Sequence, residues 1–202
     1  MTAATLADAL PPRMDGADAV RLFTRPSMGN LFGLLAPKFV NVRPQGAPAP
    51  PMPFAERLWM PAYALCFNVT IAGRGNRDIW VSVCAWSGSF SLFECLDLLQ
   101  PLETTEEFFP AGITPETAHA MGRQSFLTYV LRRRGQFNKP VVESVSETRL
   151  YHAPYWVLYT RRRAGLDLRV IDGYSGATCG PKLKRGILDA LIACRKAQPA
   201  NS

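Results

Sequence analysis

The sequence predicts an α+β fold in which two related β-hairpin-plus-helix units, in the order α-ββ-α-ββ-α, form an antiparallel sheet behind a helical N-terminal extension. Three observations predict this fold. The 202 residues are 48% hydrophobic and 19% charged, which is typical of a globular protein. Runs with the period of a strand alternate with runs that have the period of a helix. The stretch Pro61–Asn68 also looks like a smaller-residue version of the stretch Pro154–Arg163.

The first 57 residues are predicted to lie outside the two units. Asp15 and Asp18 suit a helix N-terminus, and the apolar residues after them recur near helical spacing. Residues 41–55 are rich in proline, which lacks an N–H group and favours an extended connector. The predicted domains are a loose tail with a helical extension at 1–40, a proline-rich linker at 41–57, and two units at 58–135 and 136–202.

The first unit is predicted from alternating apolar and polar residues. Strands are expected near 58–69 and 78–86, with a glycine-rich turn between them. The stretch 90–99 is apolar, and its type stays open. A helix is expected to begin after Thr114, a good N-cap, and to end at Gly135.

The second unit repeats the hairpin and the helix. A strand is expected at about 141–149, followed by a hairpin that starts at Pro154 and turns near Gly165. The closing stretch Pro181–Lys196 predicts an amphipathic helix that packs on the sheet. Its apolar residues on one face are Leu183, Ile187, Leu191 and Cys194.

Placing Pro61 on Pro154 aligns the two hairpins. With a shorter loop in the second hairpin, Cys84 then falls on Asp172. Internal duplication explains this match, and convergent hairpin chemistry is the alternative.

One face of the strand after Pro154 carries large residues, including Tyr155 and Tyr159, where the first hairpin carries small ones. Two interpretations of this contrast stay open. The small face lets two sheets approach closely, or the contrast leaves a shallow aromatic groove for a small molecule.

The second hairpin ends in RVIDGYSG and resembles PepSY-like domains, whose strands often end in Asp-x-x-Thr-Gly or Asp-x-x-Ser-Gly turns. It is also similar to uncharacterised prokaryotic proteins with a Pro-aromatic-Trp strand before such a turn. The resemblance covers about residues 150–192, with a fainter echo at 58–90. It implies a small sheet with a covering helix, used for protein contacts or regulation, and it implies no catalytic residues.

The whole chain has a net charge of +7, and its positive charge is concentrated in the second half. Residues 1–120 carry 8 Lys/Arg and 11 Asp/Glu, whereas residues 121–202 carry 15 and 5. This asymmetry predicts an acidic partner, and a solvated basic face is the alternative. The candidate partner-binding residues are basic side chains expected to converge on one surface, with two tyrosines beside them: Arg132, Arg133, Arg134, Arg161, Arg162, Arg163, Lys182, Lys184, Arg185, Tyr155 and Tyr159.

No motif for catalysis, metal binding or a cofactor occurs. The two histidines, His119 and His152, and the five cysteines show no HxxxH, HExxH or CxxC spacing. No GxGxxG, Walker A or GxSxG motif occurs either. A catalytic Cys/His pair is the alternative to reduced, buried thiols. The prediction is therefore a protein without catalytic residues, metal or cofactor.

The expected location is the cytoplasm. No stretch reaches the roughly 18 apolar residues of a membrane-spanning helix, and the first residues lack a basic region followed by an apolar run. The oligomeric state stays open.

Together these observations predict a non-enzymatic interaction or accessory module that binds an acidic protein through its basic C-terminal half. Binding of RNA or DNA by the same arginines, with tyrosines stacked on bases, is the alternative.

Overall fold

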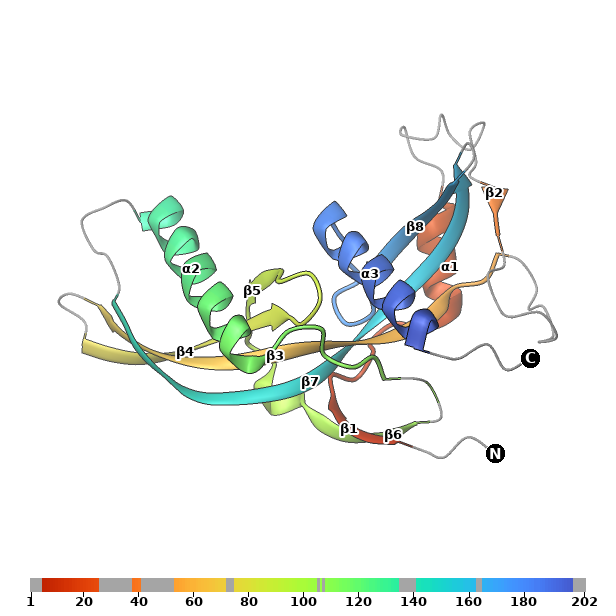
Figure 1. Ribbon diagram of the computed structural model, residues 1–202. Helices are drawn as coiled ribbons and strands as arrows, with labels where there is room; N and C mark the ends of the chain where they lie inside the picture. Colours follow the sequence, from red (N-terminus) through yellow and green to blue (C-terminus); the bar gives the residue numbers. More distant parts are fainter. Residues whose placement is uncertain are drawn as a thin grey trace.

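The computed structural model describes residues 5–25, 38–40, 53–71, 75–104, 106, 108–134, 141–162 and 165–197. Within these residues, eight strands form one sheet and three α-helices pack on it (Figure 1). The strands are β1 (Thr5–Ala9), β2 (Lys38–Phe39), β3 (Glu56–Ile71), β4 (Gly75–Cys84), β5 (Phe90–Leu92), β6 (Gln100–Thr104), β7 (Val141–Arg162) and β8 (Gly165–Asp172). The helices are α1 (Gly16–Thr24), α2 (Pro115–Arg134) and α3 (Pro181–Ala197), with a short 3-10 helix η2 (Leu96–Leu98).

The sheet is built on two long strands, β3 and β7, which pair antiparallel from Glu56↔Val157 to Thr70↔Val141. Strand β4 pairs with β3, and β8 pairs with the second half of β7. The order along the sheet is β5-β4-β3-β7-β1-β6, with β2 and β8 also paired to β7. Figure 1 shows β3 and β7 running the length of the molecule, with α2 over one end and α1 and α3 at the other.

The predicted fold class is wrong. The elements do not form separate hairpin-plus-helix units in the order α-ββ-α-ββ-α, because β3 and β7 pair with each other and join both hairpins into one sheet. Strands β1, β2, β5 and β6 also belong to that sheet. The sequence pattern that predicted the units is local, and it carries no information on pairing between strands far apart in the chain.

Two strand boundaries also differ from the prediction. The expected strands at 141–149 and after Pro154 are one strand of 22 residues, β7. The expected loose tail contains β1, which pairs antiparallel with β6 and meets β7 at Ala9↔His152. Most of the predicted linker, residues 41–52, lies outside the described residues, and β3 begins at Glu56.

The two long predicted helices are confirmed. Helix α2 begins at Pro115, after Thr114, whose hydroxyl accepts a hydrogen bond from the amide of Thr117 at 3.3 Å. Helix α3 packs on β7 and β8 through the predicted apolar face, with Ile187 fully buried and Leu183 and its other members partly buried.

Proline fixes how the segment before α1 joins the sheet. The amide of Gly173 donates to the carbonyl of Pro154 at 2.8 Å, as in an antiparallel pair that exchanges two hydrogen bonds. Proline has no N–H group to complete the exchange. The carbonyl of Gly173 therefore accepts from the amide of Arg13 instead, at 3.0 Å.

The first hairpin repeats this arrangement before α2. The amide of Ala85 donates to the carbonyl of Pro61 at 2.9 Å, and the carbonyl of Ala85 accepts from the amide of Gly112 at 3.1 Å. Because each proline lacks an N–H group, the carbonyl of the residue opposite it is available to accept a hydrogen bond from the segment that leads into a helix.

The registers of the two hairpins agree with the predicted residue alignment. Ala62 faces Cys84 in the first hairpin, and Tyr155 faces Asp172 in the second. Each hairpin is followed by a glycine with positive φ, which is Gly88 after the first and Gly176 after the second. The inferred duplication stays a prediction.

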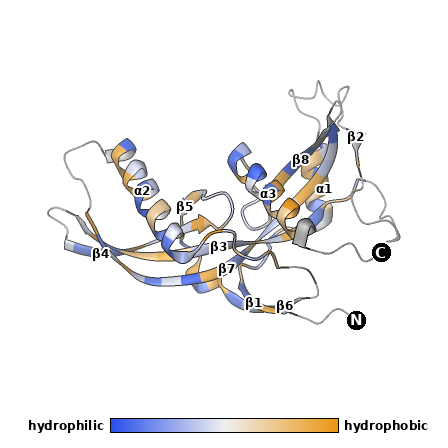
Figure 2. Cartoon of the chain, in the orientation of Figure 1, coloured by the Kyte–Doolittle hydropathy of each residue, from blue (hydrophilic) through white to orange (hydrophobic). Residues whose placement is uncertain are grey.

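Both faces of the sheet are covered near the helices. Helix α2 packs on β3 and β4 around Leu65 and Val83, whereas α1 packs on β7 and β8 around Trp156 and Leu158. Helix α3 covers the other face of the second hairpin, around Val157. Figure 2 shows hydrophobic residues gathered on this hairpin and more hydrophilic residues along the first half of β7.

Candidate functional site

The candidate site lies on the outer face of α1. Asp15 caps this helix, because its carboxylate accepts a hydrogen bond from the amide of Asp18 at 2.8 Å. Ala19 and Phe23 are buried against Trp156 and its neighbours on the second hairpin. Residues three and four apart share a helix face, so this packing leaves the remaining face of α1 exposed.

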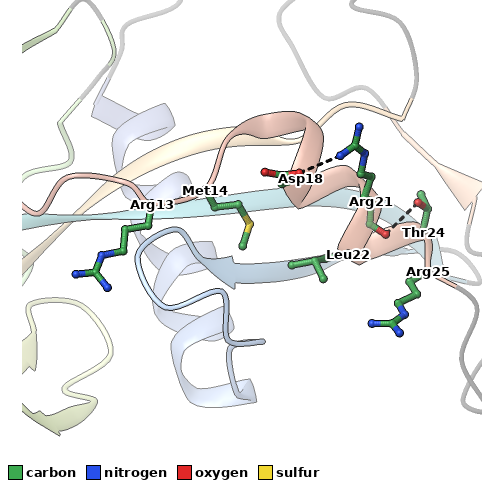
Figure 3. A pocket seen from close by; sticks show the side chains of 7 residues that line it. All are labelled: Arg13, Met14, Asp18, Arg21, Leu22, Thr24 and Arg25. Carbon is green, nitrogen blue, oxygen red and sulfur yellow. Dashed lines mark hydrogen bonds and ion pairs between the residues drawn. The ribbon is translucent and has the colours of Figure 1, made fainter.

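A groove of about 690 Å³ follows α1 and the segment before it (Figure 3). Its lining residues are Arg13, Met14, Asp18, Arg21, Leu22, Thr24 and Arg25. Figure 3 shows the side chains of Met14 and Leu22 between those of Arg13 and Arg25. The groove therefore has an apolar middle and a basic side chain at each end.

The electrostatic balance of the groove favours an anion. Among the described residues, three arginines and one carboxylate line the groove, and the carboxylate, Asp18, lies 3.2 Å from Nη1 of Arg21. The Arg21 side chain is 81% exposed, so this ion pair is screened by water and stabilises the fold little. A carboxylate or phosphate of a partner can therefore replace Asp18 as the partner of Arg21 with little loss of stability of the fold.

One contact positions the Arg13 side chain, and another fixes the end of α1. The guanidinium of Arg13 lies over the ring of Tyr174, 4.2 Å from its centroid, in cation–π geometry. At the other end of α1, Nη1 of Arg169 on β8 donates to the carbonyl of Phe23 at 3.1 Å. This bond occupies a carbonyl that the helix itself leaves without a partner in its last turn.

The equivalent position on the first hairpin is closed. Gly112 is the counterpart of Arg13, and a Cβ atom on it would lie 2.7–2.9 Å from ring atoms of Trp86. The Trp86 indole donates to the carbonyl of Pro110 at 2.8 Å, which keeps its ring against this segment. Arg13 therefore stands where the first hairpin accepts only glycine.

The predicted basic residues lie apart from this groove. Helix α2 carries Arg132, which is exposed, and α3 carries Lys182, Lys184 and Arg185 near its start. Nζ of Lys182 donates to the carbonyl of Gly88 at 3.1 Å, so it links α3 to a turn. The side chains of Arg133, Arg134 and Arg162, and all of Arg163, lie outside the described residues.

The three basic groups do not converge. The end of α2 precedes the start of β7, whereas Arg161 lies at the far end of that strand. A straight strand of 22 residues spans roughly 70 Å. Figure 1 shows the end of α2 and the tip of the β7–β8 hairpin at opposite ends of the molecule.

The predicted aromatic candidates belong to the core. Tyr159 is 5% exposed, and its hydroxyl donates to the Glu56 carboxylate at 2.7 Å. Tyr155 is half-buried between the residues under α3 and those around Tyr151, and burial raises its pKa well above the ordinary value. The buried ring of Tyr159 therefore offers no stacking face to a nucleic-acid base, and the role predicted for Tyr155 stays a prediction.

A second, smaller groove of about 490 Å³ lies between α2 and β5. Arg132 lines it together with Phe90, whose ring centroid is 6.1 Å from that of Tyr129. The remaining lining residues are polar: Gln124, Ser125 and Thr128. This groove has one basic group, so it offers less to an anion than the groove beside α1.

The described residues contain no group of three or more His, Cys, Asp or Glu side chains that could hold a metal ion. Among the described residues, Cys66, Cys84, Cys95 and Cys179 form no disulfide, and burial raises the pKa of Cys179 to about 12, which keeps its thiol protonated. His152 is buried, and its Nε2 lies 3.1 Å from the carbonyl oxygen of Phe109. In the same part of the chain, no helix is both long and apolar enough to span a bilayer.

The charge excess of the second half of the chain gives no indication of the arginines that line the groove. Arg21 and Arg25 are four residues apart, a spacing that would place them on one face of a predicted helix, although α1 ends at Thr24 and Arg25 is its C-cap. That signal was available. No local signal predicts the position of Arg13 beside Tyr174, because the two residues are 161 positions apart in the chain.

Comparison of the chain with protein-family models, with curated proteins and with solved structures gives no match. The resemblance of residues 150–192 to PepSY-like domains therefore stays a prediction from the sequence.

Proposed function

We propose that this protein is a non-enzymatic interaction module that binds an acidic macromolecular partner in the groove beside α1. One observation carries the proposal: among the described residues, the groove is lined by three arginines, Arg13, Arg21 and Arg25, and one acidic residue, Asp18. Such a surface attracts anionic groups and steers their approach, with a strength that falls as salt is added. The binding residues differ from those that the charge excess of the C-terminal half predicts.

We also assign the protein to the cytoplasm. The support is chemical: Cys66, Cys84, Cys95 and Cys179 form no disulfide, and reduced thiols are usual in a reducing compartment.

The test uses the full chain and a labelled peptide of alternating glutamate and leucine, with fluorescence anisotropy as the measurement. We expect binding that weakens as salt is added and that disappears when glutamine replaces glutamate in the peptide. The variant Arg21→Glu/Arg25→Glu should bind roughly tenfold more weakly or worse, because two attractive pairs become repulsive.

The matched control is Arg77→Glu/Arg149→Glu, which makes the same charge change on exposed residues that line neither groove. Equal loss of binding in both variants would mean that net charge alone is responsible, and the groove assignment would then be wrong. Tighter binding of a single-stranded oligonucleotide than of the acidic peptide would favour a nucleic-acid partner and contradict the proposal.

A further inference from the structure

We infer that the occupant of the groove is an extended protein segment with a large apolar side chain between two carboxylates. This inference rests on the proposed function and specifies the chemistry of its partner.

The apolar requirement follows from the middle of the groove. Met14 and Leu22 lie between the arginines in Figure 3, and Leu22 is 42% exposed. A flexible methionine beside an exposed leucine gives an adaptable apolar surface. A purely polar ligand would leave this surface in water, whereas an apolar side chain would remove both residues from water, which is favourable in proportion to the area buried.

The spacing of the carboxylates follows from the ends of the groove. Arg13 precedes α1 and Arg25 follows it, and a helix of nine residues is roughly 14 Å long. An extended chain covers this distance in about four or five residues, at about 3.3 Å per residue. Carboxylates at the two ends of such a segment reach both arginines while the residue between them meets Met14 and Leu22.

The choice of a protein over a nucleic acid follows from the aromatic residues. Single-stranded nucleic acids are bound by exposed rings on which bases stack. Among the described residues, the groove lining contains no aromatic side chain, and Arg13 covers one face of the nearby Tyr174 ring. The described part of the groove thus has the charges that a phosphate backbone needs and lacks the rings that bases need.

The two hairpins differ at the start of the helix that covers each of them, and this difference explains the open, basic groove beside α1. Helix α2 has 20 residues and covers the first hairpin, whereas α1 has nine and covers the second. At the start of α2, Gly112 packs tightly under Trp86, while at the start of α1 Arg13 projects over Tyr174. The shorter helix and the larger side chain leave an open, basic surface on one hairpin.

The experiment compares two labelled peptides on the full chain by fluorescence anisotropy: one with leucine between flanking glutamates, and one of glutamate alone. We expect the leucine peptide to bind more tightly, and we expect Leu22→Gln to weaken it by several fold while leaving the all-glutamate peptide unchanged. The control is Leu131→Gln, which changes a leucine of similar exposure, 41%, on α2.

The outcomes separate the two proposals. If both peptides bind equally, Leu22→Gln has no effect and Arg21→Glu/Arg25→Glu abolishes binding, then the proposed function stands and the apolar occupant is wrong. If neither peptide binds, both proposals fail. If Leu131→Gln weakens the leucine peptide as much as Leu22→Gln does, the peptide is bound elsewhere and the inference is overturned.

Discussion

The amide of Gly173 donates a 2.8 Å hydrogen bond to the carbonyl of Pro154, which has no N–H group to return. The carbonyl of Gly173 is therefore open to the amide of Arg13, and this bond anchors the segment that places Arg13 in the groove. Pro154 thus affects the position of Arg13 without contacting it through a hydrogen bond, because it leaves the Gly173 carbonyl available to the Arg13 amide.

Pro154→Ala is expected to weaken that anchor. Alanine supplies an N–H group that competes with Arg13 for the Gly173 carbonyl. The change also makes the unfolded chain more flexible, which lowers the free energy of unfolding by about 0.4–1 kcal/mol. Hydrogen exchange of the Arg13 amide should become faster, while that of the Gly112 amide should not change. Pro61→Ala is the mirror control, because it should affect Gly112 and spare Arg13. Full protection of Arg13 in Pro154→Ala would show that the proline does not direct this contact.

Ile187→Ala should destabilise the fold by about 2–4 kcal/mol, because it removes a fully buried side chain and leaves a cavity under α3. Ile192→Ala on the same helix, where the side chain is 50% exposed, should cost less than about 1 kcal/mol. Urea unfolding measures both free energies. Equal losses for the two variants would mean that α3 does not pack as described.

Glu106→Gln should destabilise the protein by about 1 kcal/mol near neutral pH, because the Arg57 guanidinium donates two 2.7 Å hydrogen bonds to this half-buried carboxylate. Burial alone would raise the pKa of Glu106, but the hydrogen bonds from Arg57 and Trp59 outweigh it and lower the pKa below its ordinary value of 4.5. The carboxylate therefore stabilises the fold above about pH 4.5, and this contribution is lost as the pH falls through the folded-state pKa.

Urea unfolding of the wild type and Glu106→Gln at a series of pH values tests this account. The difference between the two proteins should shrink toward acid. Glu103→Gln, which changes an exposed carboxylate on β6, is the control and should match the wild type throughout. A difference between Glu106→Gln and the wild type that does not depend on pH would contradict the role given to the charge.

His152→Gln should make the stability less sensitive to acid. Burial lowers the pKa of His152 below 6.5, although the carbonyls of Phe109 and Asp8 favour the protonated ring. The unfolded chain therefore takes up a proton that the folded chain does not, and stability falls as the pH drops from about 6.5 toward the folded-state pKa. Glutamine does not titrate, so this part of the slope should vanish. Melting temperatures between neutral and acidic pH measure it, with His119→Gln as the control. The same slope in His152→Gln and the wild type would assign the pH dependence to other groups.

The sequence by itself determined the features that neighbouring residues control. Thr114 and the apolar spacing around Ile187 fixed the start of α2 and the buried face of α3, because caps and helix periodicity act over a few residues. The alignment of Cys84 with Asp172 likewise agrees with the hairpin registers, because turn geometry sets register locally.

Tertiary structure alone decided the rest. The pairing of β3 with β7 turned the expected units into one sheet, and the packing of α1 and α3 on opposite faces of the second hairpin placed Tyr159 in the core. The groove depends on contacts of Arg13 with Tyr174 and of Phe23 with Arg169, each between residues more than 140 positions apart. Such contacts form only when the whole chain buries its apolar surface, and no local pattern of residue types encodes which distant backbone or ring will be adjacent.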